Sequence, residues 1–388
     1  MSKRHAEIAG AGLAGLTAAA ALGKAGWSVR VHERNDELRE LGAGILIWEN
    51  GIWALKEVGA FEDATRGTDF VKDWELRDER NRTLQHEWML PGVKESYAIL
   101  RTQLHQALAK AAERAGAEIV TSSSVAGATT DGELILVSGE RCKADLVIGA
   151  DGINSKVRDS VGLVERVNDL RDGCGRHLIE REPSDIKDGI LERWDGGRRI
   201  GIVPCTQDKI YIFLCCPASD AVGIEQESGD FSAWVESFPE FEHYISRIPP
   251  GGRWASFGDV RARKWSAGNV ALIGDAAHSM SPNLGQAACV AMMNAVVLSY
   301  RLDEYSTMSA ALAKWEETER EIIDRTQKYS RFYGWIGTHW PRYALPVRSA
   351  LVWSLAHSKR AQAHINAAAT YKPDLDRRVR DAAVGATS

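Results

Sequence analysis

The sequence predicts an α/β fold in which a parallel sheet with flanking helices carries an inserted antiparallel sheet and ends in a helical C-terminal tail. Three observations predict this fold. The chain opens with a strand, a glycine-rich turn, a helix and a second strand. Apolar strands recur near residues 144–149 and 270–273, and short alternating polar segments lie between these regions. With 388 residues, 44% of them apolar, the chain can bury a large core in roughly two to three domains.

Composition excludes several classes of function. The net charge is −5, from 48 basic and 53 acidic residues, so no basic surface for nucleic acid or for anionic lipid is expected. The six cysteines include no Cys-x-x-Cys pair and are interpreted as reduced thiols, with neither a disulfide framework nor a metal site. The longest apolar stretch, residues 8–23, is broken by glycines and is neither a signal peptide nor a membrane span. We therefore expect a cytoplasmic protein without a nucleic-acid or membrane partner.

The first third of the chain supplies most of the parallel sheet. Residues 5–9 and 27–33 form short strands around a helix over 12–26, which ends at a glycine. Further helices are expected over 50–59 and 101–116. The strands that follow are predicted over 118–121, 134–137 and 144–149.

The remaining segments divide the chain further. Alternating segments over 71–87 and 189–217 are typical of an antiparallel sheet with one wet face. A buried strand over 270–273 leads into helices over 286–300 and 306–325, and the tail beyond Tyr329 is mostly helical. The predicted domains are a discontinuous nucleotide-binding domain (1–70, 97–165, 265–325), a substrate domain (71–96, 166–264) and a C-terminal helical region (326–388).

The most specific motif is Gly10-Ala-Gly12-Leu-Ala-Gly15, which follows a strand and opens a helix. Gly10 permits the tight turn, Gly12 lets a pyrophosphate approach the backbone, and Gly15 lets helix and strand pack closely. Glu33, at the end of the next strand, can accept a hydrogen bond from a ribose hydroxyl and would repel a 2′-phosphate. The motif predicts a Rossmann-like dinucleotide site; alone it does not separate FAD from NAD.

Two further motifs place an aspartate after an apolar strand. Asp151 opens Asp151-Gly-Ile-Asn-Ser155, and Asp275 precedes a loop with Pro282 and Gly285 that opens a helix. On the residues alone, an ordinary Asp-Gly turn is the favoured interpretation of the first motif, and a capped loop is the alternative for the second. The positive end of the helix after Gly285 would stabilise a negative charge in that loop. His278 is interpreted as a structural loop histidine.

Together the three motifs, with their spacing, resemble the single-component FAD-dependent aromatic hydroxylases, the para-hydroxybenzoate and salicylate hydroxylase superfamily, over residues 7–325. The resemblance implies bound FAD, with NADH or NADPH as a transient hydride donor, and makes the parallel sheet an FAD-binding domain. It assigns Glu33 to the adenosine ribose, Arg101 to the pyrophosphate and Asp275 to the ribityl chain. Residues 42–45 resemble a segment beside the flavin. The implied cofactor-binding residues are Gly10, Gly12, Leu13, Ala14, Gly15, Glu33, Arg34, Arg101, Val125, Asp151, Asp275, Gly285, Ala287 and Ala288.

Within this superfamily the sequence is most similar to the oxygenases of 2-methyl-3-hydroxypyridine-5-carboxylate. That similarity implies catalytic roles for Arg199, which would clamp an acidic group, and Tyr211, which would bond the ring hydroxyl. The implied substrate-binding residues are Leu46, Arg199, Tyr211, Ser281 and Pro282. Two of them depart from the pattern, because Leu46 replaces an aromatic residue and Ser281 a cysteine.

The implied reaction is the NAD(P)H-driven insertion of one oxygen atom of O₂ into a small hydroxylated aromatic acid, foremost a hydroxypyridine derivative. Hydroxylation, ipso substitution and ring opening share this first step and stay open. The alternatives are a salicylate-type benzenoid hydroxylase, a flavin dehydrogenase or reductase without oxygen transfer, an NAD dehydrogenase and a flavin-bound sensor. A monomer or homodimer is expected.

Overall fold

A computed structural model describes residues 3–38, 43–87 and 93–375. Its first part is a six-stranded sheet in the order β18-β19-β12-β1-β2-β8, parallel except for the β18–β19 pair. The strands are β1 (His5–Ala9), β2 (Ser28–His32), β8 (Glu118–Val120), β12 (Leu146–Gly149), β18 (Ser266–Ala267) and β19 (Val270–Leu272). The chain adds β2 on one side of β1 and later returns to add β12 on the other. Such a reversal of strand order opens a crevice at the carboxyl ends of the strands.

Small side chains allow the helices to pack closely around this sheet. In α1 (Leu13–Lys24) the residues Leu16, Ala18, Ala19 and Ala20 are at most 1% exposed. The helix is buried on nearly all sides because α4 and α10 both pack against it. The neighbouring helices are α2 (Glu49–Val58), α3 (Phe61–Thr65), α4 (Arg101–Arg114), α5 (Lys156–Ser160), α9 (Asp275–His278) and α10 (Ala287–Glu304).

The second part is a seven-stranded sheet in the order β17-β13-β16-β15-β14-β5-β6. Its strands are β5 (Trp74–Arg77), β6 (Thr83–Glu87), β13 (Val164–Glu180), β14 (Ile190–Asp195), β15 (Arg198–Pro204), β16 (Lys209–Pro217) and β17 (Trp254–Ala262). The pairs are antiparallel, as predicted, except that β5 runs parallel to β14. Three short helices and a 3₁₀ turn accompany this sheet: α6 (Ala221–Ile224), α7 (Ser232–Ser237), η1 (Pro239–Phe241) and α8 (Glu242–Ile245).

The two faces of this sheet are distinguished by the period of two along each strand. Ile200, Ile202, Ile210, Ile212 and Leu214 point to one face, where they pack with Trp234 and Phe238 of the short-helix segment. The alternate residues point to the opposite face. That second face is therefore available to line a site.

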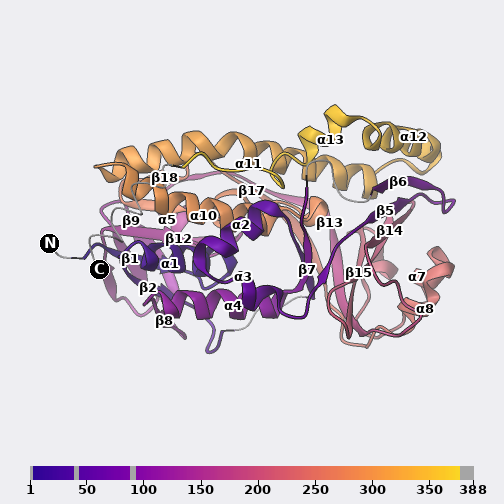
Figure 1. Ribbon diagram of the computed structural model, residues 1–388, viewed down its shortest axis with the longest axis horizontal. Coiled ribbons are helices and arrows are strands. Elements are labelled where there is room, and N and C mark those ends of the chain that lie inside the picture. Colours follow the sequence, from indigo (N-terminus) through magenta and orange to yellow (C-terminus); the bar gives the residue numbers. More distant parts are fainter. Residues whose placement is uncertain (1–2, 39–42, 88–92, 376–388) are drawn as a thin grey trace.

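Two small sheets and a set of C-terminal helices complete the described chain. One sheet contains β9 (Val125–Thr129), β10 (Glu133–Leu136) and β11 (Arg141–Lys143); the other contains β3 (Gly44–Ile47), β4 (Asp69–Phe70) and β7 (Tyr97–Leu100). The long helix α11 (Met308–Thr338) runs beside the first part and continues over the second (Figure 1). After it come η3 (Arg342–Ala344), α12 (Leu345–Ala356) and α13 (Lys359–Ile365), while the 3₁₀ turn η2 (Pro282–Leu284) precedes α10.

The structure differs from the expected elements at the end of one helix and at two strands. The helix predicted over 306–325 continues to Thr338, so residue 326 lies inside α11. Strands β13 and β17 were not predicted, because their charged residues obscure the alternation. Gly42, in the segment expected beside the flavin, and 376–388 of the tail lie outside the described residues.

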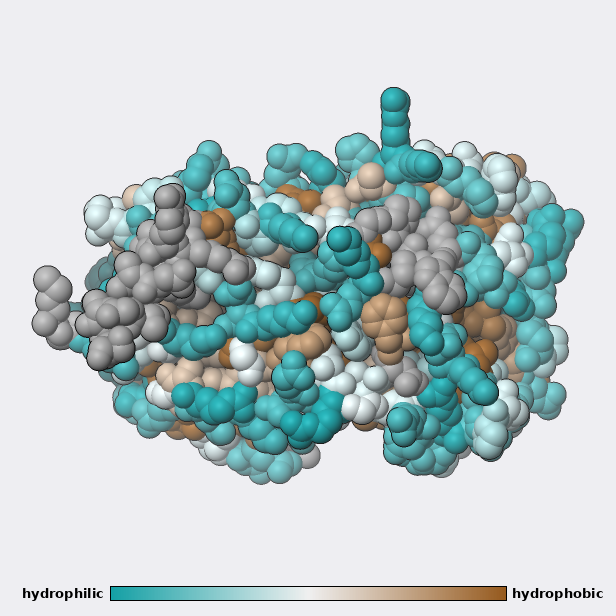
Figure 2. Space-filling view, viewed as in Figure 1, coloured by the Kyte–Doolittle hydropathy of each residue, from teal (hydrophilic) through white to brown (hydrophobic). Residues whose placement is uncertain are grey.

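The outer surface matches the composition. The face seen in Figure 2 is mostly hydrophilic, with small hydrophobic areas separated by polar side chains. Among the helices that the structure describes, none has both the length and the apolar content needed to cross a bilayer.

Candidate active site

The glycine-rich turn forms a tight backbone bend with open space beside it. Gly10 has φ 99°, and a Cβ there would lie 2.5 Å from the carbonyl oxygen of Ala150. A Cβ on Gly15 would lie 2.0 Å from the oxygen of Gly10, so this glycine is required for packing. A Cβ on Gly12, in contrast, would meet nothing within 4 Å. The backbone N–H groups at the start of α1 therefore border a space that a phosphate group fits.

Glu33 lies beside this turn, at the carboxyl end of β2. Its carboxylate accepts hydrogen bonds from the backbone N–H of Ala11, at 3.1 Å, and of Asn35, at 3.0 Å. These bonds fix the carboxylate at the position where an adenosine ribose is expected. Arg34, which follows it, is exposed. The turn and Glu33 together fit the adenosine diphosphate half of FAD.

A cavity of about 480 Å³ lies between the two parts of the molecule. The first part contributes the start of α1, Arg101 at the start of α4, the loop after β19 and the start of α10. The second part contributes the open face of the seven-stranded sheet. Of the predicted residues, the cavity is lined by Gly12, Leu13, Ala14, Leu46, Arg101, Arg199, Tyr211, Asp275, Pro282, Gly285, Ala287 and Ala288.

The loop after β19 presents two helix starts to this cavity. Gly274 has φ 58°, and a Cβ there would lie 2.8 Å from that of Ala14, so the loop lies directly on α1. Asp275 follows as the first residue of α9. Gly285, with φ 63°, accepts a hydrogen bond at 2.9 Å from the indole N–H of Trp48. Ala287 and Ala288 at the start of α10 line the cavity, and the first turn contains no acidic residue that would offset its positive end.

Asp151 is placed differently from Asp275. Its carboxylate accepts hydrogen bonds from Ser155 Oγ at 2.5 Å and from the backbone N–H groups of Lys156 and Val157 at 2.7 and 3.1 Å. It therefore caps α5, while its neighbours Gly152 and Ile153 line the cavity. The hydrogen bonds of this carboxylate thus stabilise the turn before α5.

Five residues of the predicted set lie outside the cavity wall, besides the packed Gly10 and Gly15. Glu33 and Arg34 follow β2, Val125 is the first residue of β9, and Asp151 caps α5. Ser281 is 2% exposed, and its hydroxyl lies 3.0 Å from that of Ser330 on α11. The structure therefore does not place Ser281 among the residues around the cavity, because its hydroxyl is held against α11.

The sheet face in the cavity follows from strand register. Arg199 pairs with Cys215, and Val203 pairs with Tyr211, on the antiparallel strands β15 and β16. These four residues share one face, but Arg199 and Tyr211 are separated by four residues along the sheet. They therefore line the cavity at two separate positions along the sheet.

Arg199 is held by a buried network. Its guanidinium donates a hydrogen bond of 2.5 Å to Asn283 Oδ1, lies 3.8 Å from a carboxylate oxygen of Glu192 and stacks over the Tyr333 ring at 6.0 Å. Burial raises the pKa of Glu192 above its ordinary value, although Arg199 opposes that shift. The ion pair is long, and the carboxylates of Glu192 and Asp172 both favour the charged form of the Arg199 guanidinium.

Tyr211 packs against Gly44, in the segment that the resemblance places beside the flavin. A Cβ on Gly44 would lie 2.7 Å from the Tyr211 ring, so a side chain at that position would displace it. Burial raises the pKa of Tyr211, with Cys174 adding to the shift. The phenol therefore stays protonated and can donate a hydrogen bond.

Sequence reasoning missed several residues of this wall. Arg176 and Cys174 come from the unpredicted strand β13, whose register places them opposite Phe213 and Cys215. Glu192, Trp74 and Asn283 also line the cavity. The period of two along β13 could have found Arg176, had the strand been recognised. His278 does not line the cavity; burial lowers its pKa to about 4, and its ring packs on Trp265.

Comparison with known proteins agrees with this geometry. The FAD binding domain family matches residues 4–330. A putative 2-heptyl-3-hydroxy-4(1H)-quinolone synthase of Rhodococcus erythropolis is 39% identical, over 84% of this chain and 86% of its own length. A 2-heptyl-3-hydroxy-4(1H)-quinolone synthase of Mycobacteroides abscessus is 35% identical, over 85% of this chain and 90% of its own.

Among solved structures, the tetrameric form of 2-methyl-3-hydroxypyridine-5-carboxylic acid oxygenase superposes with a TM-score of 0.85. It is 35% identical, and the match covers 96% of this chain and 97% of that one. The similarity extends through both parts of the molecule and the C-terminal helices.

Proposed function

The chain belongs to the FAD binding domain family and is a flavin-dependent monooxygenase of the aromatic hydroxylase type, and from this premise we propose that its substrate is a hydroxypyridine-type ring. The class includes the benzo-fused form, a 4-quinolone, which the names of the two quinolone synthases favour. The hydroxypyridine acid oxygenase favours the monocyclic form. Both rings carry nitrogen and an oxygen substituent.

One observation carries the proposal. The nucleotide-binding edge of the parallel sheet and the Arg199–Tyr211 face of the second sheet border the same cavity. A ring bound against that face therefore lies next to the starts of α9 and α10, where the flavin end of FAD fits. A cytoplasmic location and a monomeric or homodimeric state stay predictions.

Bound FAD would supply the chemistry for accepting a hydride from NADH or NADPH and for activating O₂. The residues of the chain position the substrate. Arg199 attracts an acidic or ionised ring oxygen, and its charge stabilises the ionised form, which is richer in electrons. Tyr211, which keeps its proton, donates a hydrogen bond to a second polar group of the ring. Leu46, Val203 and Phe213 supply apolar walls that exclude water.

The test uses the FAD-loaded full chain and a panel of hydroxypyridine acids, 4-quinolones and salicylates. We expect a member of the first two classes to accelerate NAD(P)H oxidation and to yield a product that carries one ¹⁸O atom from ¹⁸O₂. Incorporation into salicylates alone would reassign the protein to the benzenoid hydroxylases. Oxidation of NAD(P)H without incorporation into any ring would indicate a dehydrogenase or reductase and overturn the proposal.

A further inference from the structure

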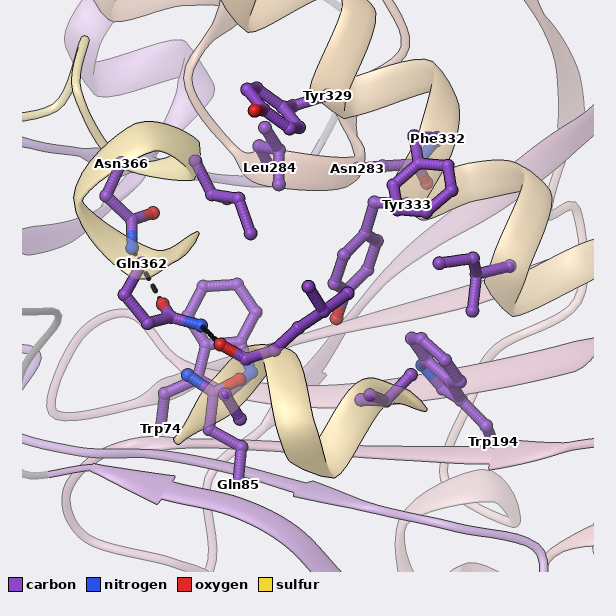
Figure 3. A pocket seen from close by; sticks show the side chains of 15 residues that line it. Trp74, Gln85, Trp194, Asn283, Leu284, Tyr329, Phe332, Tyr333, Gln362 and Asn366 are labelled. Carbon is purple, nitrogen blue, oxygen red and sulfur yellow. Dashed lines mark hydrogen bonds between the residues drawn. The ribbon is translucent and has the colours of Figure 1, made fainter. Parts of the chain in front are cut away.

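A second, smaller cavity of about 70 Å³ adjoins the ring cavity. It lies between the ends of β5 and β6 and the helices α11, α12 and α13, and we call it the helical chamber. Its wall is mostly hydrocarbon and aromatic, including Trp194, Phe332, Tyr333, Ile336, Val352 and Leu355. Figure 3 shows the rings of Tyr333 and Trp194 on one side, and Gln362 and Asn366 opposite them.

The polar groups in this wall are largely paired with one another. The amide of Gln362 donates to the backbone oxygen of Leu355 at 3.1 Å, and Asn366 donates to Gln362 Oε1 at 3.0 Å (Figure 3). Asn283 accepts the bond from Arg199. The indole N–H of Trp194 donates to Glu192 at 2.7 Å. The space between these groups therefore offers mainly apolar contact.

The chamber and the ring cavity share part of their walls. Trp74 and Asn283 line both. Trp74 stacks on Trp48 at 6.2 Å between ring centroids, and Trp48 in turn is hydrogen-bonded to Gly285, so the position of the Trp74 ring is fixed. Asn283 is fixed by Arg199. A substituent that leaves the bound ring between Trp74 and Asn283 would enter the chamber.

We propose that the helical chamber binds a short hydrocarbon tail on the substrate ring, an inference that rests on the proposed function. The ring end of the substrate is polar and contacts Arg199 and Tyr211, while the tail contacts mainly apolar atoms. The chamber's volume limits the tail to a few carbons. A longer tail has to displace the rim at Phe332, which is 40% exposed.

Tail length is the direct test. Binding of 2-alkyl-4-quinolones with methyl, propyl, pentyl and heptyl tails is measured from the flavin absorption change of the FAD-loaded protein. Each methylene that enters the chamber should tighten binding by about fourfold, since burial of a methylene contributes about 0.8 kcal/mol. The gain should level off once the chamber is full.

A matched pair of variants on α12 locates the effect. Ala356 is 5% exposed and lines the chamber, whereas Ala350 is exposed on the same helix. Ala356→Phe should weaken binding of the pentyl compound at least tenfold and leave the methyl compound within twofold. Ala350→Phe should change neither. If Ala356→Phe fails to fold, Leu355→Ala provides the test. Because this variant enlarges the chamber, the tail length that binds most tightly should become longer.

The outcomes separate this inference from the proposed function. If the methyl quinolone binds and is oxygenated but tail length has no effect, or if Ala356→Phe weakens all compounds equally, the tail assignment is wrong and the proposed function stands. If no quinolone or hydroxypyridine acid binds or is oxygenated, the proposed function itself fails.

Discussion

Arg199 donates a hydrogen bond of 2.5 Å to Asn283, a residue 84 positions further along the chain. Arg199 belongs to the seven-stranded sheet, and Asn283 belongs to the loop between the parallel sheet and α10. The bond joins the sheet face proposed to bind the substrate to the loop proposed to border the cofactor. A movement of either element would therefore change the distance between the two ligands.

Replacement of Arg199 tests the anchor for an acidic ring. Arg199→Ala should weaken binding of a hydroxypyridine acid by about 10- to 100-fold, the range for loss of a hydrogen bond to a charged group. FAD retention should change less than substrate affinity, because Arg199 lies on the seven-stranded sheet and reaches the loop before α10 only through Asn283. Titration of flavin absorption measures both. Arg360→Ala, at an exposed arginine of α13, is the charge-matched control; unchanged substrate affinity in Arg199→Ala would remove this residue from the site.

Two glycine replacements should fail for different reasons. In Gly12→Ala the new methyl group meets no protein atom within 4 Å, so the apoprotein should melt within a few degrees of the wild type. The methyl group would instead occupy the space next to the phosphates, and FAD affinity should fall at least tenfold. In Gly15→Ala the methyl group lies 2.0 Å from the Gly10 oxygen, so the fold itself should be destabilised.

Melting curves with and without FAD distinguish the two glycine variants. If Gly12→Ala retains FAD at full affinity, the phosphates do not lie at the start of α1.

The hydroxyl of Tyr211 should affect the coupling of NAD(P)H oxidation to product formation more than it affects substrate binding. Burial keeps the phenol protonated, so Tyr211→Phe removes a hydrogen-bond donor and little volume. We expect substrate affinity to fall by less than tenfold and the product formed per NAD(P)H consumed to fall several-fold. Tyr343→Phe, at a residue that is 91% exposed, is the control. An unchanged product ratio in Tyr211→Phe would contradict the role.

Glu319 on α11 should make stability depend on pH. Burial raises its pKa to about 7, and the hydroxyl of Tyr371 donates to it at 3.0 Å. The folded state therefore binds a proton more tightly than the unfolded state does. Stability should fall as pH rises from the ordinary glutamate range, about 4.5, through 7.

The amide variant isolates this carboxyl. Glu319→Gln should flatten the fall in the free energy of unfolding between pH 5 and 8, as measured by urea titration at several pH values, roughly by 1 to 3 kcal/mol. Glu317→Gln, whose carboxylate is exposed on the same helix, should keep the wild-type slope. Parallel curves for Glu319→Gln and the wild type would show that another group sets the slope.

The sequence predicted the features that depend on local chemistry. The turn from Gly10 to Gly15 was predicted because a tight bend before a helix demands glycine, and α1, β2 and β19 followed from apolar periodicity. Asp275 and Gly285, which the resemblance to a family assigned to the cofactor site, line the cavity, and their contacts with the cofactor stay a prediction.

What the sequence did not reveal depends on contacts between distant segments. The wall residues Arg176 and Glu192 reach the cavity through strand register, which is set by pairing across the sheet. The hydroxyl of Ser281 is hydrogen-bonded to that of Ser330, 49 residues away, and no local sequence pattern predicts such a bond. Helix α11 continues past Arg325 because its second half packs on the substrate sheet.

The length of α11 has a consequence for engineering. Gln327 of this helix donates to the backbone oxygens of Val260 and Ser279, which belong to β17 and to the loop after α9. The seven-stranded sheet therefore cannot be exchanged for that of a relative independently of α11. A chimera that contains the sheet of a relative should also contain the second half of that relative's α11. Otherwise the hydrogen bonds from Gln327 that align the sheet with the rest of the protein will be lost.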